Sequence, residues 1–234
     1  MSCDVVCLRP EADFHKVGVA PPANLSIAFR APDADDLAQL FETARAVVIP
    51  AVGPALPASL FEGSAVRLVQ VTGAGVDRLD RPEMEALGIA VANVPGGSNA
   101  AIAEYAVSTA LFLLRSFGES TAAIRAGDYA AHRGELVKAL PRGLEDMTVG
   151  VIGLGTIGLD VARAFRRMGS RIVYFDPAPR DPAAAAEMGA ESVDLQTLLS
   201  TADIVTLHVP LIATTRGLIG AAESAVRWDA ADGG

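Results

Sequence analysis

Short apolar runs and helical patterns alternate along the first hundred residues of the chain. Runs rich in Val, Ile and Leu predict buried strands at residues 5–8, 25–29, 46–49, 67–71 and 89–91. Between them, residues 33–44 place apolar side chains at helical spacing behind Asp33, a candidate N-cap, and prolines open short helices at 57–62 and 82–87. Strands that alternate with helices predict a parallel α/β sheet.

The second part of the chain begins after a Pro-Gly-Gly-Ser breaker at 95–98. A long helix is predicted at 99–117, and Glu104 and Arg115 interrupt its apolar stretch, which favours a buried helix over a membrane span. Residues 118–145 are mixed and polar. The remaining pattern predicts strands at 149–152, 171–176, 191–193 and 204–207, and helices at 159–168, 182–188 and 195–199. We therefore divide the chain into two domains, residues 1–98 and 99–234.

Three glycines follow the strand at 149–152 with the spacing G-x-G-x-x-G: Gly153, Gly155 and Gly158. A helix pattern comes next, and the following strand ends on Asp176, about twenty residues downstream. This combination of strand, turn, helix, strand and acid is typical of a dinucleotide-binding unit. The simpler interpretation is a glycine-rich turn in an ordinary α/β fold.

Each residue type in this unit has a chemical reason. Gly153 permits a tight turn, Gly155 lets the backbone approach a pyrophosphate, and Gly158 lets the helix pack closely. The helix N-terminus offers N–H groups to phosphates. Asp176 can accept hydrogen bonds from the ribose hydroxyls of adenosine and would repel a 2′-phosphate, so we expect NAD rather than NADP.

A second glycine turn, Gly73-Ala74-Gly75, follows the strand at 67–71. Its small residues expose backbone N–H groups that can bind an anion such as a carboxylate, although many ordinary strand–helix turns also contain glycine. Asn99 can cap the long helix or reach a ligand, and capping is the simpler interpretation.

His208 ends the strand at 204–207, on the side of a parallel sheet where ligands bind. With Val209 and Pro210 it is expected to face the nucleotide. A general base is the alternative role for His208, because hydride chemistry on alcohols needs one. His15 and His132 lie in polar surroundings and are interpreted as surface residues.

Composition narrows the class of partner. The net charge of −9 argues against nucleic acid or an anionic membrane surface, and 51% apolar residues provide for a sizeable core. Cys3 and Cys7 lie four residues apart with no second pair, so we expect reduced thiols and no metal site. No basic segment followed by an apolar core opens the chain, which favours the cytoplasm.

Four blocks resemble the D-isomer-specific 2-hydroxyacid dehydrogenase family. They are Thr72 to Asp77; Asn93 to Gly96 with Asn99, Ala103 and Glu104; Gly150 to Gly158 with Asp176; and Leu207 to Leu211 with Thr215 to Ile219. The first block resembles the family's substrate-carboxylate loop, and the second resembles its interdomain segment and hinge helix. The third block resembles the family's NAD fingerprint, and the fourth resembles the segment that follows its fourth strand.

The resemblance implies a Rossmann-type doubly wound sheet and an N-terminal flavodoxin-like substrate domain. It assigns NAD to Gly153, Gly155, Thr156, Ile157, Gly158, Asp176, His208, Val209, Pro210 and Thr215, and a small 2-hydroxy or 2-keto acid to Gly73, Ala74, Gly75 and Asn99. Because His208 to Pro210 then line the adenosine side, His208 is discounted as the catalytic base. A homodimer through the NAD domain, with the hinge helix and residues 118–145 taking part, is also implied.

The family's catalytic arginine, glutamate and histidine follow the segment that ends at Ile219, and we place none of them in this chain. Residues 224–234 depart from the family pattern, which suggests a frameshift or premature stop. Strands 5 and 6 of the sheet are then missing, so the edge of the strand at 204–207 is expected to be open and the product marginal or self-associating. Function is predicted as a dehydrogenase impaired by truncation, or alternatively a non-catalytic NAD-binding or interaction module.

Overall fold

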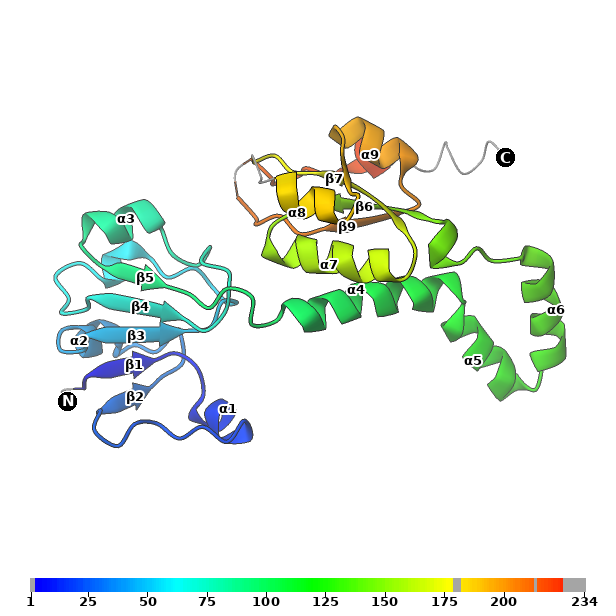
Figure 1. The fold of residues 1–234 in the computed structure, drawn as a ribbon. Helices are drawn as coiled ribbons and strands as arrows, with labels where there is room; N and C mark the ends of the chain where they lie inside the picture. The colour runs from blue at the N-terminus through cyan, green and yellow to red at the C-terminus, as the bar shows by residue number, and fades with distance from the viewer. Residues whose placement is uncertain (1–2, 179–181, 213, 225–234) are drawn as a thin grey trace. The chain divides into compact units, whose positions relative to one another are not determined.

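The structure is a computed structural model that describes residues 3–178, 182–212 and 214–224. The chain separates into two compact units, residues 1–97 and 98–234 (Figure 1). The boundary predicted from the sequence lies one residue later, after residue 98.

Unit 1 contains a parallel five-stranded sheet. Its strands are β1 (Val5–Cys7), β2 (Ile27–Phe29), β3 (Ala46–Ile49), β4 (Leu68–Val71) and β5 (Ala90–Ala92), in the order β2-β1-β3-β4-β5. The helical elements are α1 (Glu11–Lys16), α2 (Leu37–Phe41), the 3-10 turn η1 (Ala58–Leu60) and α3 (Arg81–Ala86). This strand order is that of flavodoxin-like folds, as predicted.

The core of unit 1 forms where alternate strand residues meet the covering helices. Val6, Val47 and Val69 are fully buried, and the rings of Phe41 and Phe61 lie 5.2 Å apart between their centroids. The apolar runs that predicted the strands therefore supply this core.

Two local predictions in unit 1 were wrong, and one helix was missed. The helix expected at 33–44 is only α2, and the carboxylate of its N-cap residue, Asp36, binds the Arg30 guanidinium at 2.9 Å instead of capping the helix. The helix expected at 57–62 is the single turn η1. Helix α1 was not predicted.

Unit 2 contains a parallel four-stranded sheet in the described residues. Strands β6 (Thr148–Ile152), β7 (Arg171–Phe175), β8 (Glu191–Ser192) and β9 (Ile204–Leu207) have the order β8-β7-β6-β9. This is the 3-2-1-4 portion of a Rossmann-type sheet. On the part of the chain that is described, β9 pairs with β6 and with no other strand, so it is an edge strand; the self-association expected from this edge stays a prediction.

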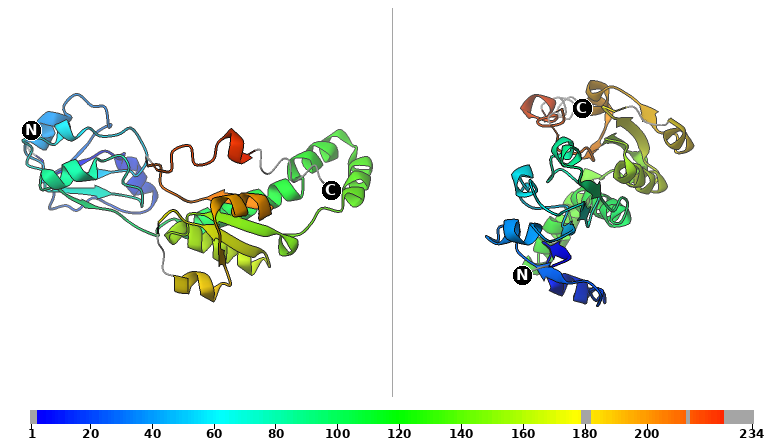
Figure 2. Two further views of the ribbon diagram at one scale, coloured as in Figure 1. Left: turned by 90° about the horizontal axis from the view of Figure 1, so that it is seen from above. Right: turned by 90° about the vertical axis from the view of Figure 1, so that its left-hand side faces the viewer.

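Helices cover both faces of this sheet. Helices α4 (Asn99–Leu114) and α7 (Thr156–Arg167) lie side by side on one face, as Figures 1 and 2 show. Helix α9 (Leu195–Thr201) lies on the other face, where Leu198 packs with Ile152 and Val173. Helix α8 (Pro182–Glu187) and the 3-10 turn η2 (Leu144–Asp146) complete the unit.

The mixed segment 118–145 contains two helices that were not predicted, α5 (Phe117–Ala126) and α6 (Tyr129–Ala139). Neither helix buries a residue, so the sequence carries no apolar stripe to reveal them. Ser116 makes the turn from α4 to α5 in the left-handed region, with φ of 47°. Figure 1 shows both helices beyond the end of α4, away from the sheet.

No single helix among the described residues is long and apolar enough to cross a membrane. Helices α4 and α5 have the required length and apolar composition only when taken together, and they are bent by 52° relative to each other. Cys3 and Cys7 are free and buried. The tail interpreted as a frameshift lies outside the described residues beyond position 224.

Candidate cofactor and substrate sites

The turn between β6 and α7 is closed by two glycines that no other residue fits. Gly153 has φ of +90°, and a Cβ on it would lie 2.8 Å from the His208 carbonyl oxygen and 2.7 Å from Val209 Cγ1. A Cβ on Gly158 would lie only 1.9 Å from the Gly153 carbonyl oxygen. The first turn of α7 is therefore pressed directly against the end of β6.

This packing leaves the N-terminus of α7 as a donor site. Gly155 is the N-cap, and its carbonyl accepts the first helical bond from Leu159 N–H at 2.9 Å. Helix geometry gives the N–H groups of the preceding residues, which include Thr156 and Ile157, no acceptor within the helix. Together with the positive end of the helix dipole, they suit the two charges of a pyrophosphate.

Asp176 is held beside this turn. Its Oδ2 accepts from Leu154 N–H at 2.8 Å, and its Oδ1 accepts from Ala178 N–H at 2.9 Å. These bonds fix the carboxylate at the end of β7, beside the glycine turn. The glycine turn, the helix N-terminus and this acid fit an adenine dinucleotide.

His208 and Val209 follow β9 and lie against the same turn, and their role toward the nucleotide stays a prediction. His208 N–H donates to Ile152 O at 2.7 Å and so extends the ladder between β9 and β6. The imidazole Nε2 lies 2.8 Å from Thr206 Oγ1, and burial lowers the pKa of His208 below its ordinary value of 6.5. The ring is thus neutral near pH 7.

The loop after β9 is closed by the buried side chain of Thr215. Its Oγ1 accepts from Ile212 N–H at 3.0 Å and donates to the carbonyl of Pro210. These bonds shape the segment that contains Pro210, which is itself exposed. The roles of Pro210 and Thr215 toward NAD stay predictions.

Asn99 does not cap α4, contrary to the simpler interpretation of the sequence. Ser98 is the N-cap, and no side chain caps this helix. The Asn99 amide nitrogen instead donates to Thr156 O at 3.1 Å and to Asp160 Oδ2 at 2.9 Å, while the buried Oδ1 has no partner in the described chain. The hydrogen bond from Asn99 is the main reason that the pKa of Asp160 is lowered.

Neighbouring residues hold the carbonyl groups of the turn Gly73-Ala74-Gly75 in unit 1. Val94 N–H donates to Gly73 O at 2.9 Å, and Asn93 Nδ2 donates to Ala74 O at 2.8 Å. With these carbonyls engaged, the three N–H groups of the turn donate to no acceptor in the described residues. A Cβ on Gly73 would lie 2.7 Å from Ala51 Cβ, so close packing also requires glycine here.

Two arginines beside this turn were missed at the sequence level. Arg78 is 4% exposed and donates to Pro50 O at 2.7 Å and Pro54 O at 2.8 Å. Arg9 donates to Thr72 Oγ1 at 3.3 Å. Arginine is usually a surface residue, and nothing in the local sequence around either position marks it as a structural or binding residue.

Comparisons with known proteins agree with this geometry. The sequence model described as "D-isomer specific 2-hydroxyacid dehydrogenase, NAD binding domain" matches residues 107–226. The D-lactate dehydrogenase kk1H of Curvularia clavata is 37% identical over 156 residues, which are 67% of this chain and 42% of that protein. The glyoxylate reductase of Thermococcus litoralis is 34% identical over 162 residues, 68% of this chain and 48% of that protein.

Solved structures share the fold. A D-lactate dehydrogenase from Aquifex aeolicus, in complex with NAD and lactic acid, matches with a TM-score of 0.80 at 21% identity, covering 95% of this chain and 65% of that chain. The fold and the glycine turn thus define an α/β protein with an NAD-binding domain of the Rossmann class.

The chain belongs to the D-isomer specific 2-hydroxyacid dehydrogenase family, and NAD is the cofactor of the matched domain. It spans less than half of the length of the two curated relatives compared above.

Proposed function

We propose that this protein is an NAD-dependent oxidoreductase of small 2-hydroxy and 2-keto acids. The observation that carries the proposal is the turn at Gly153–Gly158, which is closed by backbone contacts and has the Asp176 carboxylate fixed beside it. When bound, NAD supplies a hydride acceptor for the C2 position of a hydroxy acid, and NADH the corresponding donor.

Each residue of unit 2 has a separate binding task in this proposal. The N–H groups of Thr156 and Ile157 bind the pyrophosphate, and Gly155 leaves room for it. Asp176 accepts the ribose hydroxyls and disfavours a 2′-phosphate by charge repulsion. His208 and Val209 border the adenosine side, and the neutral imidazole adds no charge there.

In unit 1, the Gly73–Gly75 turn binds the substrate carboxylate through its three N–H groups. Consecutive N–H groups that face one anion are a common carboxylate and phosphate site. Asn99, which the resemblance assigns to the substrate, is instead proposed to support the cofactor turn through Thr156 O. No residue of this chain is assigned the acid–base step.

We also propose that the partner is a second copy of the chain, and that the protein works in the cytoplasm. Helices α4, α5 and α6 expose large apolar side chains, including Tyr105, Leu113, Ile124 and Val137, and exposed apolar patches of this kind mark interfaces. Sedimentation equilibrium of wild type against Leu113→Glu tests the partner. A dimer that the substitution converts to monomer supports the proposal, and a wild-type monomer rejects it.

Calorimetric titration of NADH and NADPH into the purified chain tests the cofactor site. Wild type is expected to prefer NADH, and Asp176→Asn should lower NADH affinity by about tenfold, the effect of one charge-assisted hydrogen bond. It should affect NADPH much less. An unchanged ratio of the two affinities would reject the role of Asp176.

A scan of 2-keto acids with NADH at 340 nm then tests the reaction. Turnover supports an active dehydrogenase. NADH binding without turnover supports the alternative of a non-catalytic NAD-binding module.

A further inference from the structure

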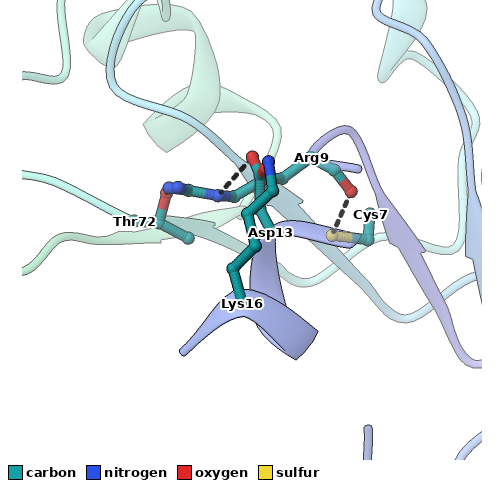
Figure 3. Close-up of polar contacts among 5 residues, drawn as sticks. All are labelled: Cys7, Arg9, Asp13, Lys16 and Thr72. Atoms are coloured by element: carbon teal, nitrogen blue, oxygen red, sulfur yellow. Dashed lines mark hydrogen bonds and ion pairs between the residues drawn. The ribbon is translucent and has the colours of Figure 1, made fainter. Parts of the chain in front are cut away.

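Arg9 reaches across the carboxyl edge of the unit 1 sheet toward the anion-binding turn. Arg9 follows β1 and Thr72 follows β4, and β3 lies between these two strands. The Arg9 Nη1 donates to Thr72 Oγ1 at 3.3 Å, as Figure 3 shows. Because Thr72 immediately precedes Gly73, this contact brings a cation next to the three N–H groups of the turn.

The position of Arg9 is fixed from both ends. Cys7 Sγ lies 3.4 Å from the Arg9 carbonyl oxygen (Figure 3). Burial raises the pKa of Cys7, so its thiol keeps the proton that it donates. At the other end, Asp13 on α1 lies 3.3 Å from Arg9 Nε and also binds Lys16 Nζ at 3.1 Å. Because one carboxylate is shared between two cations, the group of Arg9, Asp13 and Lys16 carries a net positive charge.

The guanidinium still has donors to offer. Arginine has five N–H groups, and contacts with protein in the described chain use Nε and Nη1. Nη2 has no protein acceptor among the described residues, and the Arg9 side chain is 39% exposed. The Nη1–Nη2 end therefore has the fork geometry that binds carboxylates with two parallel hydrogen bonds.

A simple surface ion pair does not account for this arrangement. An exposed pair four residues apart contributes about 0.5 kcal/mol or less to stability and needs only Arg9 and Asp13. The hydrogen bond to Thr72 goes beyond that pair, because it carries the guanidinium past β3 to the residue that precedes the turn. A guanidinium held there can share a bound anion with the turn.

We propose that Arg9 and the Gly73–Gly75 turn form a two-part anion site that takes a short 2-hydroxy or 2-keto dicarboxylic acid. The turn binds the carboxylate next to C2, and Arg9 binds the carboxylate at the far end of the substrate. Arg9 contacts Thr72, the residue immediately before the turn, so a substrate that engages both must carry its second carboxylate only a few atoms from the first. We therefore choose a four-carbon dicarboxylic acid as the probe, and lactate, which has only the carboxylate next to C2, as its comparison. This inference rests on the proposed function, because it assigns the turn to the substrate carboxylate.

Backbone amide NMR titration of the full chain tests the site directly. With saturating NADH present, D-malate or D-lactate is added, and the amide signals of Gly73, Ala74 and Gly75 are followed. No hydride can pass between NADH and a hydroxy acid, because both are reduced, so the titration measures binding alone. The variants are Arg9→Gln, Arg9→Lys and the matched control Lys16→Gln, which removes the same charge from the same group of side chains.

We expect D-malate to bind wild type at least tenfold more tightly than D-lactate. Arg9→Gln should remove this preference by weakening D-malate about tenfold while D-lactate changes less than about threefold, and Lys16→Gln should preserve it. Arg9→Lys keeps the charge without the fork and should lose part of the preference; it replaces Arg9→Gln if that variant does not fold.

Three results would overturn the assignment of Arg9: equal wild-type affinities for the two acids, equal losses in Arg9→Gln and Lys16→Gln, or equal weakening of both acids by Arg9→Gln. The failure of the proposed function looks different. In that case NADH does not bind, or neither acid shifts the Gly73–Gly75 signals of wild type.

Discussion

Replacement of Gly158 by alanine tests the close approach of α7 to the end of β6. The added methyl would lie 1.9 Å from the Gly153 carbonyl oxygen, with His208 Cβ 3.4 Å away. The clashing atom is backbone, so no rotamer change relieves the contact. Helix α7 and the turn must separate by about 1 Å or more, which is the kind of backbone shift that overpacking produces.

This separation should lower both the stability of unit 2 and its affinity for NADH. Overpacking of a close interface typically costs about 1–3 kcal/mol, which lowers the melting temperature by about 3–10 °C in a domain of this size. The N–H groups of Thr156 and Ile157 move with the helix. Because oriented donors lose strength steeply with distance and angle, we expect NADH affinity to fall by about tenfold or more.

The assay combines thermal unfolding by circular dichroism with calorimetric titration of NADH. Gly134→Ala is the matched control, since it adds the same methyl in α6, where nothing lies within 4 Å of the new Cβ. Alanine is the better helix former by about 1 kcal/mol, so this control should melt at the same temperature or higher and bind NADH normally.

A Gly158→Ala protein with the melting temperature and NADH affinity of wild type would refute the reasoning. It would mean that α7 does not approach Gly153 as described, or that the helix N-terminus does not bind the cofactor. A lower melting temperature with unchanged NADH affinity would refute only the inference that the N-terminus of α7 binds the cofactor.

Three further predictions follow from buried polar groups. Arg78→Ala removes two hydrogen bonds and leaves the carbonyls of Pro50 and Pro54 without these donors. Urea unfolding should show that the free energy of unfolding of unit 1 falls by about 2–4 kcal/mol. Asn99→Ala should destabilise unit 2 by about 1–2 kcal/mol. Asn99→Asp should destabilise it more, because a carboxylate at this position would face the Asp160 carboxylate and the Thr156 carbonyl oxygen. Chemical denaturation of the two variants measures the difference. His208 has a lowered pKa when folded; its contribution is present above pH 6.5 and is lost as the pH falls through the folded value, so His208→Gln should flatten the stability profile below pH 6.5.

The strands were predictable from the sequence because packing and sequence agree there, whereas their order came from the family resemblance. Short Val- and Ile-rich runs such as those around Val6 and Val69 have no alternative to a buried sheet, and alternation with helices makes that sheet parallel. Helices α5 and α6 escaped prediction because they bury no side chain. Helix α2 contains the buried apolar residues Leu37, Leu40 and Phe41 but begins later than predicted, and the carboxylate of its N-cap Asp36 binds Arg30.

Some residues of the candidate sites were predictable from the sequence and others were not. The glycine spacing and Asp176 were predictable because they form a local motif of strand, turn, helix and acid. The partners of Asn99 lie about sixty residues away at Thr156 and Asp160, and the sequence around Asn99 suggests only a helix cap. Arg9 likewise looks like a surface residue until the sheet order brings β1 near β4.

The bond from Asn99 to Thr156 links a helix outside the glycine turn to the donor end of that turn. It ties the beginning of α4 to the beginning of α7, so a substitution in the first turn of α4 can displace the α7 N–H groups without touching a glycine. Weaker NADH binding in an α4 variant would therefore indicate a shifted α7 rather than a lost contact between α4 and the nucleotide.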